Sequence, residues 1–252
     1  MKKLLVASHL IKYLGEGNER TIVLSDVSLD IHEGEFVAIM GPSGSGKSTL
    51  MYALSGMDDV NEGKVTFQDK DLSAYSEDER SDLRRQQMGF VFQQPTLLKN
   101  LNVLDNIILP STLGNKKQAV NLTERAKSLM EQTGIGSLAK RAVTEVSGGQ
   151  LQRVGICRAL IGSPKIIFGD EPTGALNSKS ANEIMDIFST IHAQGTAIVL
   201  VTHDIKVAAY AQRVLFMSDG CVVEELSLFQ LQDNSLEHRM NLITAKMRQL
   251  EI

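Results

Sequence analysis

Residues 41–49 have the composition and spacing of a phosphate-binding loop. They read Gly41, Pro42, Ser43, Gly44, Ser45, Gly46, Lys47, Ser48 and Thr49, which fits the pattern G-x-x-x-x-G-K-[ST]. Glycines at these positions let backbone N–H groups turn toward a polyphosphate, and a helix that starts there adds a favourable dipole. Lys47 would reach the β- and γ-phosphates of a nucleotide and Ser48 would hold Mg²⁺. The alternative is a flexible Gly/Ser connection between two elements.

The flanking residues favour the phosphate-binding loop over a flexible connection. An apolar run at 36–40 precedes the loop, and residues 50–54 after it have helical spacing, so we expect a strand, a loop and a helix in that order. Apolar segments at 4–11 and 22–31, bounded by turn residues, predict two further strands. The chain therefore begins with a small β layer that leads into the loop strand.

Two carboxylates follow a later apolar run. Asp170 and Glu171 come after residues 166–168, with Gly169 between. A phosphate-binding loop needs a carboxylate at the end of a neighbouring strand to complete its metal site. Asp170 would bind Mg²⁺, directly or through water, and Glu171 would polarise the attacking water. The alternative is a strand end with two acidic residues, and Gly169 is unusual because glycine weakens a strand interior.

A second pair of glycines opens a helical run in the middle of the chain. Ser147, Gly148, Gly149 and Gln150 precede it, so N–H groups and a helix dipole would again face an anion. Lying between a phosphate-binding loop and an acidic pair, this segment resembles the signature motif of the ABC-type ATPases, apart from Val146 where leucine is usual. In that family the signature of one subunit closes over the γ-phosphate held by the other. The resemblance implies a head-to-tail homodimer with two ATP molecules at its interface.

The same resemblance assigns roles to four further residues. Tyr13 resembles the aromatic residue that stacks on adenine, although it could equally be a tyrosine packed at a strand end. Gln93 resembles the glutamine that touches Mg²⁺ and the lytic water, and His203 resembles the switch histidine that contacts the γ-phosphate. Asn177 replaces the usual aspartate of the family; it keeps the hydrogen-bonding shape and loses the charge. It could instead serve chiefly as the N-cap of the next helix.

The pattern along the rest of the chain predicts an α/β fold. Helical periodicity runs from about 97 to 161. An apolar run at 166–168, a helix at about 180–193 and a strand at 197–201 follow, and this alternation of strands and helices is typical of a parallel sheet. The resemblance implies a P-loop NTPase of the RecA-like type, with an N-terminal antiparallel β layer and an inserted α-helical lobe. We expect one domain over 1–252, with its core at about 1–94 and 162–226 and its helical subdomain at about 95–161.

The C-terminal segment from about 227 to 252 lies outside this resemblance. Its apolar residues recur at helical spacing, namely Leu236, Met240, Ile243, Met247 and Leu250. They predict an amphipathic helix that packs on its own domain, with a partner interface as the alternative.

Composition limits the classes of partner. The net charge of −4 argues against a nucleic-acid surface, and no apolar run reaches the roughly 18 residues that span a bilayer. Two cysteines without metal-type spacing, Cys157 and Cys221, suit a reducing cytosol. These features favour a cytoplasmic protein, and the family resemblance implies that an integral membrane permease holds it at the inner face of the cell membrane.

The sequences at 34–49, 89–94 and 170–180 resemble those of one branch of the family, which serves macrolide exporters, lipoprotein-release complexes and antimicrobial-peptide resistance transporters. The resemblance implies an ATP-hydrolysing subunit whose dimerisation on ATP drives a permease that exports or releases a peptide, drug or lipoprotein. A cell-division ATPase that signals through a membrane partner without transport is the alternative. A DNA-repair ATPase would need a longer insertion between residues 93 and 147, and a translation factor would need two cassettes.

Overall fold

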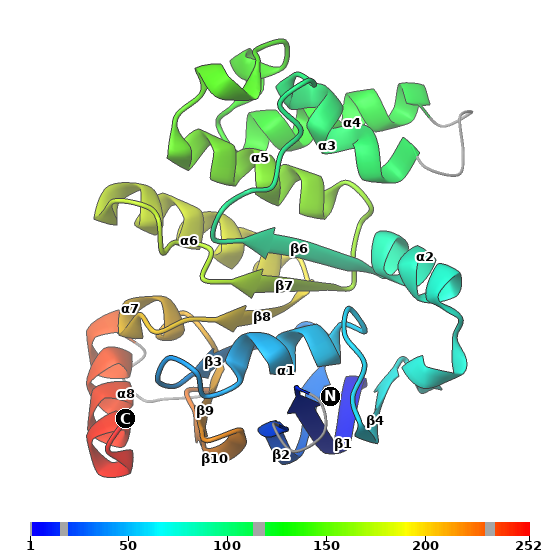
Figure 1. The fold of residues 1–252 in the computed structure, drawn as a ribbon. Helices are drawn as coiled ribbons and strands as arrows, with labels where there is room; N and C mark the ends of the chain where they lie inside the picture. Colours follow the sequence, from blue (N-terminus) through cyan, green and yellow to red (C-terminus); the bar gives the residue numbers. More distant parts are fainter. Residues whose placement is uncertain (1, 16–19, 113–118, 230–234) are drawn as a thin grey trace. The chain divides into compact units, whose positions relative to one another are not determined.

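A computed structural model describes residues 2–15, 20–112, 119–229 and 235–252. The chain forms two compact units: Met1–Arg80 with Ala197–Ile252, and Ser81–Thr196. Figure 1 shows the elements of both units along the chain. The expected core and helical subdomain have other boundaries, and that division stays a prediction.

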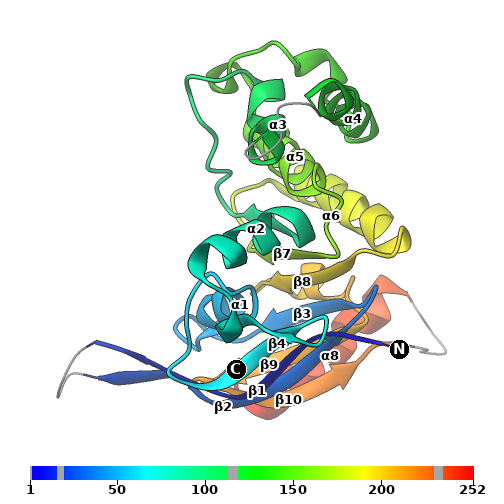
Figure 2. The same cartoon turned by 90° about the vertical axis from the view of Figure 1, so that its right-hand side faces the viewer.

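The first unit contains an antiparallel sheet and a mostly parallel one. The antiparallel sheet has the order β2 (Thr21–His32), β1 (Lys3–Leu14), β4 (Glu62–Phe67) and β5 (Lys70–Asp71). In Figure 2 the β1–β2 hairpin extends beyond the other strands of this sheet. The predicted turn at 15–18 falls largely on residues 16–19, which lie outside the described residues.

The parallel strands of the first unit follow one another in the order β9 (Arg213–Ser218), β3 (Phe36–Met40) and β8 (Ala197–Val201), and β10 (Cys221–Ser227) pairs antiparallel with β9. Every residue of β3 and β8 is buried, as expected for parallel strands covered on both faces. The helix α1 (Lys47–Leu54) begins at the predicted loop and packs against β8 and β2.

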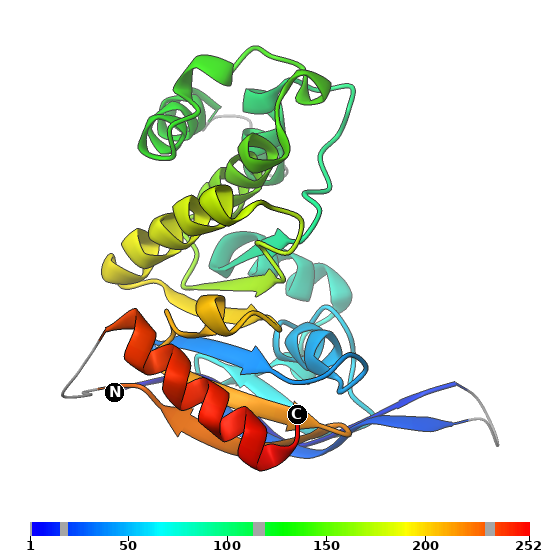
Figure 3. The same ribbon diagram turned by 90° about the vertical axis from the view of Figure 1, so that its left-hand side faces the viewer.

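Two helices complete the first unit. The single-turn helix α7 (Ile205–Ala208) packs on β3, and the C-terminal helix α8 (Leu236–Leu250) packs on α7. Figure 3 looks onto α8, drawn in red, with α7 beside it. Ile243 is fully buried, so the predicted apolar stripe of the C-terminal helix faces its own unit.

The second unit joins a strand pair to a helical cluster. Strands β6 (Met88–Phe92) and β7 (Ile166–Asp170) pair in parallel, and α2 (Glu77–Gln87) leads into β6 without burying a residue. Three helices share an apolar core: α3 (Val103–Thr112), α4 (Ala119–Gln132) and α5 (Gly148–Leu160). Its buried members include Val103, Ile107, Ala126, Met130, Val154, Cys157 and Ile161.

The helix α6 (Ser178–Ala193) packs against α5 and buries Ile184, Met185, Phe188 and Ile191. Two short 3₁₀ turns, Gly136–Leu138 and Val143–Glu145, connect α4 to α5. No helix in the described part of the chain is long and apolar enough to cross a membrane.

Candidate functional site

The glycine loop of the first unit is closely confined by its own sheets. A Cβ on Gly46 would lie 2.5 Å from the carbonyl oxygen of Val23, and φ at Gly46 is +95°. A Cβ on Gly41 would lie 2.1 Å from the carbonyl oxygen of Met217. Only glycine fits at both positions, because Cβ atoms do not approach backbone atoms this closely. The packing of the unit therefore fixes the course of the loop.

The polar groups of the loop suit a polyphosphate. Gly46, the N-cap of α1, makes no side-chain cap hydrogen bond, and the start of a helix is a favourable site for an anion. The hydroxyl of Ser45 is buried and has no hydrogen-bond partner among the described residues. Lys47 is only 8% exposed, and its Nζ donates to the carbonyl oxygens of Gly41 and Pro42 at 3.0 and 2.6 Å. Ser48 lies in the first turn of α1, where it could bind a metal ion beside the phosphates.

His203 leaves the sheet at the same edge as the loop. Strands β3 and β8 are parallel, with Ile39 opposite Val201, and the N–H of Thr202 donates to the carbonyl oxygen of Ile39 at 3.1 Å. Ligands of open parallel sheets bind at this carboxyl edge. His203 is exposed there, so the first unit brings the switch candidate and the phosphate loop to one edge.

Tyr13 lies near the end of β1, in the hairpin with β2. It is opposite Ile22 in the strand pairing, and its N–H donates to Asn61 Oδ1 at 2.8 Å. The side chain is half-buried. Its suggested role beside adenine stays a prediction.

Glu171 and Gln93 come together in the second unit. Phe92 pairs with Asp170 at the carboxyl ends of β6 and β7, so the next residue of each strand leaves the sheet at the same level. A Cβ on Gly174 would lie 3.0 Å from Gln93 Nε2 and 3.2 Å from Glu171 Oε2. The two side chains therefore converge on one point, beside the half-buried Asp170.

Glu171 has a backbone conformation that its sequence position did not reveal. Its φ is +46°, which is uncommon for a residue other than glycine and costs of order 1–3 kcal/mol. Such strain persists only where the surroundings hold it, and it concentrates at functional sites. The strain directs attention to Glu171 independently of any sequence motif.

The segment 147–150 forms a capped helix start. The N–H of Ser147 donates to Gln150 Oε1 at 2.9 Å, and the N–H of Gln150 donates to Ser147 Oγ at 3.4 Å. This is a capping box, which the spacing S-x-x-Q encodes and which we did not identify from the sequence. Ser147 and Gly148 are exposed, and a Cβ on Gly148 would meet nothing within 4 Å. The surface of the helix start is therefore open at Gly148.

Two polar side chains of α5 hold the segment that follows Gln93. Gln152 is 1% exposed, and its Nε2 donates to the carbonyl oxygen of Phe92 at 2.9 Å. Arg158 Nη1 donates to the carbonyl oxygen of Thr96 at 2.6 Å, and burial lowers the pKa of Arg158. The signature helix is thus fixed to the strand end that carries Gln93. The sequence signal for this contact was the helical spacing of Gln152 from Ile156 and Ala159, which are buried on the same face of α5.

Asn177 caps the following helix, as the second of our two interpretations expected. Its Oδ1 accepts a hydrogen bond from the N–H of Ser180 at 2.9 Å. A Cβ on Gly149 would lie 3.2 Å from Ser180 Oγ, and Arg153 pairs with Glu183 at 2.5 Å. The start of α6 therefore packs beside the signature segment of the same unit.

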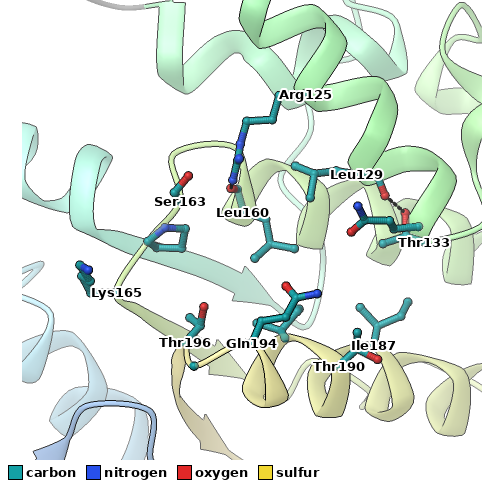
Figure 4. A pocket seen from close by; sticks show the side chains of 14 residues that line it. Arg125, Leu129, Thr133, Leu160, Ser163, Lys165, Ile187, Thr190, Gln194 and Thr196 are labelled. Atoms are coloured by element: carbon teal, nitrogen blue, oxygen red, sulfur yellow. Dashed lines mark hydrogen bonds between the residues drawn. The ribbon is translucent and has the colours of Figure 1, made fainter.

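A separate cavity of about 340 Å³ lies at the other end of β7. Figure 4 shows Arg125 and Leu129 on one side of it and Ile187, Thr190 and Gln194 on the other. Lys165 also lines it and comes just before β7, whereas Asp170 ends that strand. The cavity is therefore distinct from the residues that we assign to nucleotide chemistry.

Comparison with known proteins first defines the class. The solved dimeric structure of the ATP-binding cassette MJ0796, in a post-hydrolysis state bound to ADP and Pi, matches with a TM-score of 0.83 at 36% identity. The match covers 90% of this chain and all of that one. The fold is that of an ATPase cassette, which confirms the predicted α/β class with a P-loop NTPase core.

Residues 24–174 match the family described as ABC transporter, and the chain belongs to that family. It is 43% identical over 223 residues to the macrolide export ATP-binding/permease protein MacB of Aggregatibacter actinomycetemcomitans, covering 88% of this chain and 34% of that protein. It is also 43% identical over 218 residues to an uncharacterised ABC transporter ATP-binding protein, MJ1508, of Methanocaldococcus jannaschii, covering 86% of this chain and 97% of that protein. The chain therefore spans about a third of the length of MacB and almost the whole of the second relative. The predicted branch of the family is confirmed.

Proposed function

We propose that this chain is the ATP-binding and ATP-hydrolysing subunit of an ABC transporter, and that it dimerises on ATP to drive a membrane permease. The convergence of Gln93 and Glu171 at the carboxyl ends of β6 and β7 is the observation that best supports hydrolysis. A carboxylate held beside an amide can orient and polarise a water molecule, whereas ATP binding alone would not need a carboxylate that acts as a base.

Each residue of the site has a proposed role. The loop residues 41–49 enclose the phosphates through backbone N–H groups, Lys47 neutralises the β- and γ-phosphates, and Tyr13 stacks on adenine. Ser48, Asp170 and Gln93 would hold Mg²⁺, which would neutralise charge on the phosphate oxygens. Glu171 accepts a proton from the attacking water, and His203 contacts the γ-phosphate.

We propose a head-to-tail homodimer in which Ser147, Gly148, Gly149 and Gln150 of each chain complete the site of the other. The open space at Gly148 supports this, because a phosphate from outside the unit could approach the start of the helix there. The matching cassette MJ0796, which was solved as a dimer bound to ADP and Pi, gives independent support.

A membrane permease is the proposed partner, and the cytoplasmic face of the membrane is the proposed location. The MacB relative combines an ATP-binding part and a permease in one protein, and this chain matches about a third of its length. We propose that the permease exports or releases an antimicrobial peptide, drug or lipoprotein, by analogy with that branch. Co-purification of this chain with a permease, followed by a transport assay, tests that assignment.

The catalytic assignment is tested by Glu171→Gln. This change keeps the shape of the side chain and removes the base, so we expect ATP binding to persist and turnover to fall about 1,000-fold. Asp186→Asn, at an exposed position on α6, is the matched control and should hydrolyse ATP at the parental rate. Phosphate release and retention of labelled ATP are the measurements. Parental turnover by Glu171→Gln would show that another group is the base.

The shared site is tested by mixing two inactive variants. Lys47→Ala disables the phosphate loop, and Gly148→Asp places a negative charge where the γ-phosphate of the other chain would arrive. In a mixed dimer, one site combines the intact loop of one chain with the intact signature of the other. A 1:1 mixture should therefore recover roughly a quarter of the parental ATPase activity if the sites act independently. No recovery in mixed dimers, shown by cross-linking to have formed, would contradict a site shared between chains.

A further inference from the structure

The segment between β8 and β9 carries His203 and is short. Residue 202 follows β8, α7 occupies only Ile205–Ala208, and β9 starts at Arg213. Its beginning is held by Thr202, whose Oγ1 accepts a hydrogen bond from the N–H of Asp204 at 3.0 Å, and by Asp204, which caps α7 through the N–H of Lys206 at 2.7 Å. Only Asp204 therefore separates His203 from the start of α7.

The end of this segment is held by a residue from the C-terminal helix. Arg239 Nη1 donates to the carbonyl oxygens of Ala209 and Ala211 at 3.1 and 2.9 Å, and Nη2 donates to the carbonyl oxygen of Leu228 at 3.3 Å. Ala209, Ala211 and Leu228 are fully buried. Burial also lowers the pKa of Arg239. A buried carbonyl oxygen without a donor costs about 1–3 kcal/mol, so the end of α7 depends on this guanidinium.

Arg239 is itself held in place along α8. Ser235 caps that helix through the N–H of His238 at 3.3 Å, and the fully buried Ile243 lies one turn beyond Arg239. Lys246 pairs with Glu224 of β10 at 3.2 Å on the more exposed side of α8. Arg239 thus connects a packed helix to the backbone of the His203 segment, whereas Lys246 connects the same helix to an edge strand.

We propose that Arg239 is a positioning residue for His203, and that α8 acts through it to set the orientation of the histidine toward the γ-phosphate. This rests on the proposed function, because it takes His203 to be the γ-phosphate contact. A one-turn helix has little intrinsic stability, and its carboxyl-end carbonyls are satisfied from another element. The cationic guanidinium also suits the negative end of a helix. The C-terminal helix therefore has a part in turnover although it carries no residue of the nucleotide site.

The test uses the full chain and the variant Arg239→Met, which keeps the length of the stem and removes the donors. We expect kcat for ATP to fall about tenfold, since small displacements of a catalytic group have effects of this size or larger. KM for ATP should stay within about twofold. In a His203→Ala background, Arg239→Met should change kcat by less than about twofold. The proposed effect of Arg239 depends on the contact between His203 and the γ-phosphate, and His203→Ala has already removed that contact. Arg239→Lys, which retains charge and part of the bonding, should recover part of the rate.

Lys246→Met is the matched control, because it removes a cation from the same helix without touching α7. It should leave kcat unchanged. Hydrogen exchange of the amides of residues 203–211 supplies a readout that does not depend on ATPase activity: Arg239→Met should accelerate it about tenfold, and Lys246→Met should not.

Three results would overturn the proposal. Unchanged kcat and unchanged hydrogen exchange in Arg239→Met would show that the hydrogen bonds donated by Arg239 neither order residues 203–211 nor affect turnover. A fall in kcat that adds fully to that of His203→Ala would show an effect unrelated to the histidine. Faster exchange across the whole chain would show general destabilisation. If the parental chain hydrolyses no ATP, the proposed function fails, and local exchange at 203–211 still decides whether Arg239 holds this segment.

Discussion

The loop at 41–49 and the helix start at 147–150 are both glycine-containing backbones suited to phosphate, and they are built differently. In the loop, Gly44 and Gly46 have positive φ values of +80° and +95°, and neighbouring backbone crowds Gly46. At the second helix start, neither Gly148 nor Gly149 has a positive φ, and Gly148 faces open space. Gly44 and Gly46 let the loop adopt its positive φ values, whereas Gly148 adds no side chain to the exposed surface of its helix start.

The N-terminal capping of α1 also differs from that of α5. Gly46 leaves the first N–H groups of α1 without a side-chain cap, whereas Ser147 and Gln150 cap α5 reciprocally. A helix start that is capped by its own side chains is stable without ligand. A helix start without such a cap is a favourable site for an anion. We propose that the first site holds a nucleotide and that the second completes the site of another chain.

Within the comparison of these two sites, the largest expected effect is at Gly46 of the loop, and Gly44 provides the contrast. Gly46→Ala forces a positive φ on alanine and a contact with the carbonyl oxygen of Val23, which together cost at least about 3 kcal/mol, or about 100-fold in ATP affinity. Gly44→Ala has a similar φ, and its Cβ would meet nothing within 4 Å, so we expect a loss of about tenfold or less. Titration with a fluorescent ATP analogue measures both. Equal losses of ATP affinity in the two variants would show that the close contact with Val23 does not determine the conformation of the loop.

A smaller effect is expected at the helix start, where conformation is not strained. Gly148→Ala should leave folding and ATP binding by the isolated chain unchanged, because the added Cβ meets open space. ATP-dependent dimerisation and turnover should fall about tenfold, because the proposed partner phosphate must then meet a methyl group. Thermal unfolding, ATP titration and sedimentation separate these readouts. Loss of ATP binding in the monomer would contradict our assignment of this segment to the other chain's site.

Much of this fold could be predicted because its signals are local. The buried strands at 36–40 and 197–201 are uninterrupted apolar runs, and the structure has β3 and β8 at those residues. The predicted helix at 180–193 begins two residues earlier in the structure, at Ser178, because Asn177 caps it. An Asn at that point can be either a cap or a contact residue, and only the hydrogen bond to Ser180 shows that it caps.

The interactions that the sequence did not reveal are those between distant segments. Gln152 and Phe92 are sixty residues apart, and Arg239 contacts carbonyl oxygens about thirty residues earlier. A side chain that donates to a backbone carbonyl has no partner residue type for a motif to record. The positive φ of Glu171 is likewise imposed by its surroundings. Residue type and spacing therefore predict candidates for the chemistry, while the contacts that orient these candidates could not be predicted.

The smallest expected effect concerns one serine in each of the two sites. Ser147 caps α5, so Ser147→Ala should lower stability by about 1 kcal/mol, which corresponds to a decrease of about 2–4 °C in Tm for a protein of this size. Ser45 Oγ is buried and has no partner among the described residues. Ser45→Ala should therefore leave the ligand-free Tm unchanged or raise it by a few degrees, since an unsatisfied buried hydroxyl is costly. The stabilisation that ATP and Mg²⁺ add should shrink in Ser45→Ala, because the proposed phosphate contact is lost. A ligand-free Tm that fell equally in both variants would show that Ser45 contributes structurally as Ser147 does. The loop at 41–49 and the helix start at 147–150 would then no longer differ in whether a ligand or the protein's own side chains complete them.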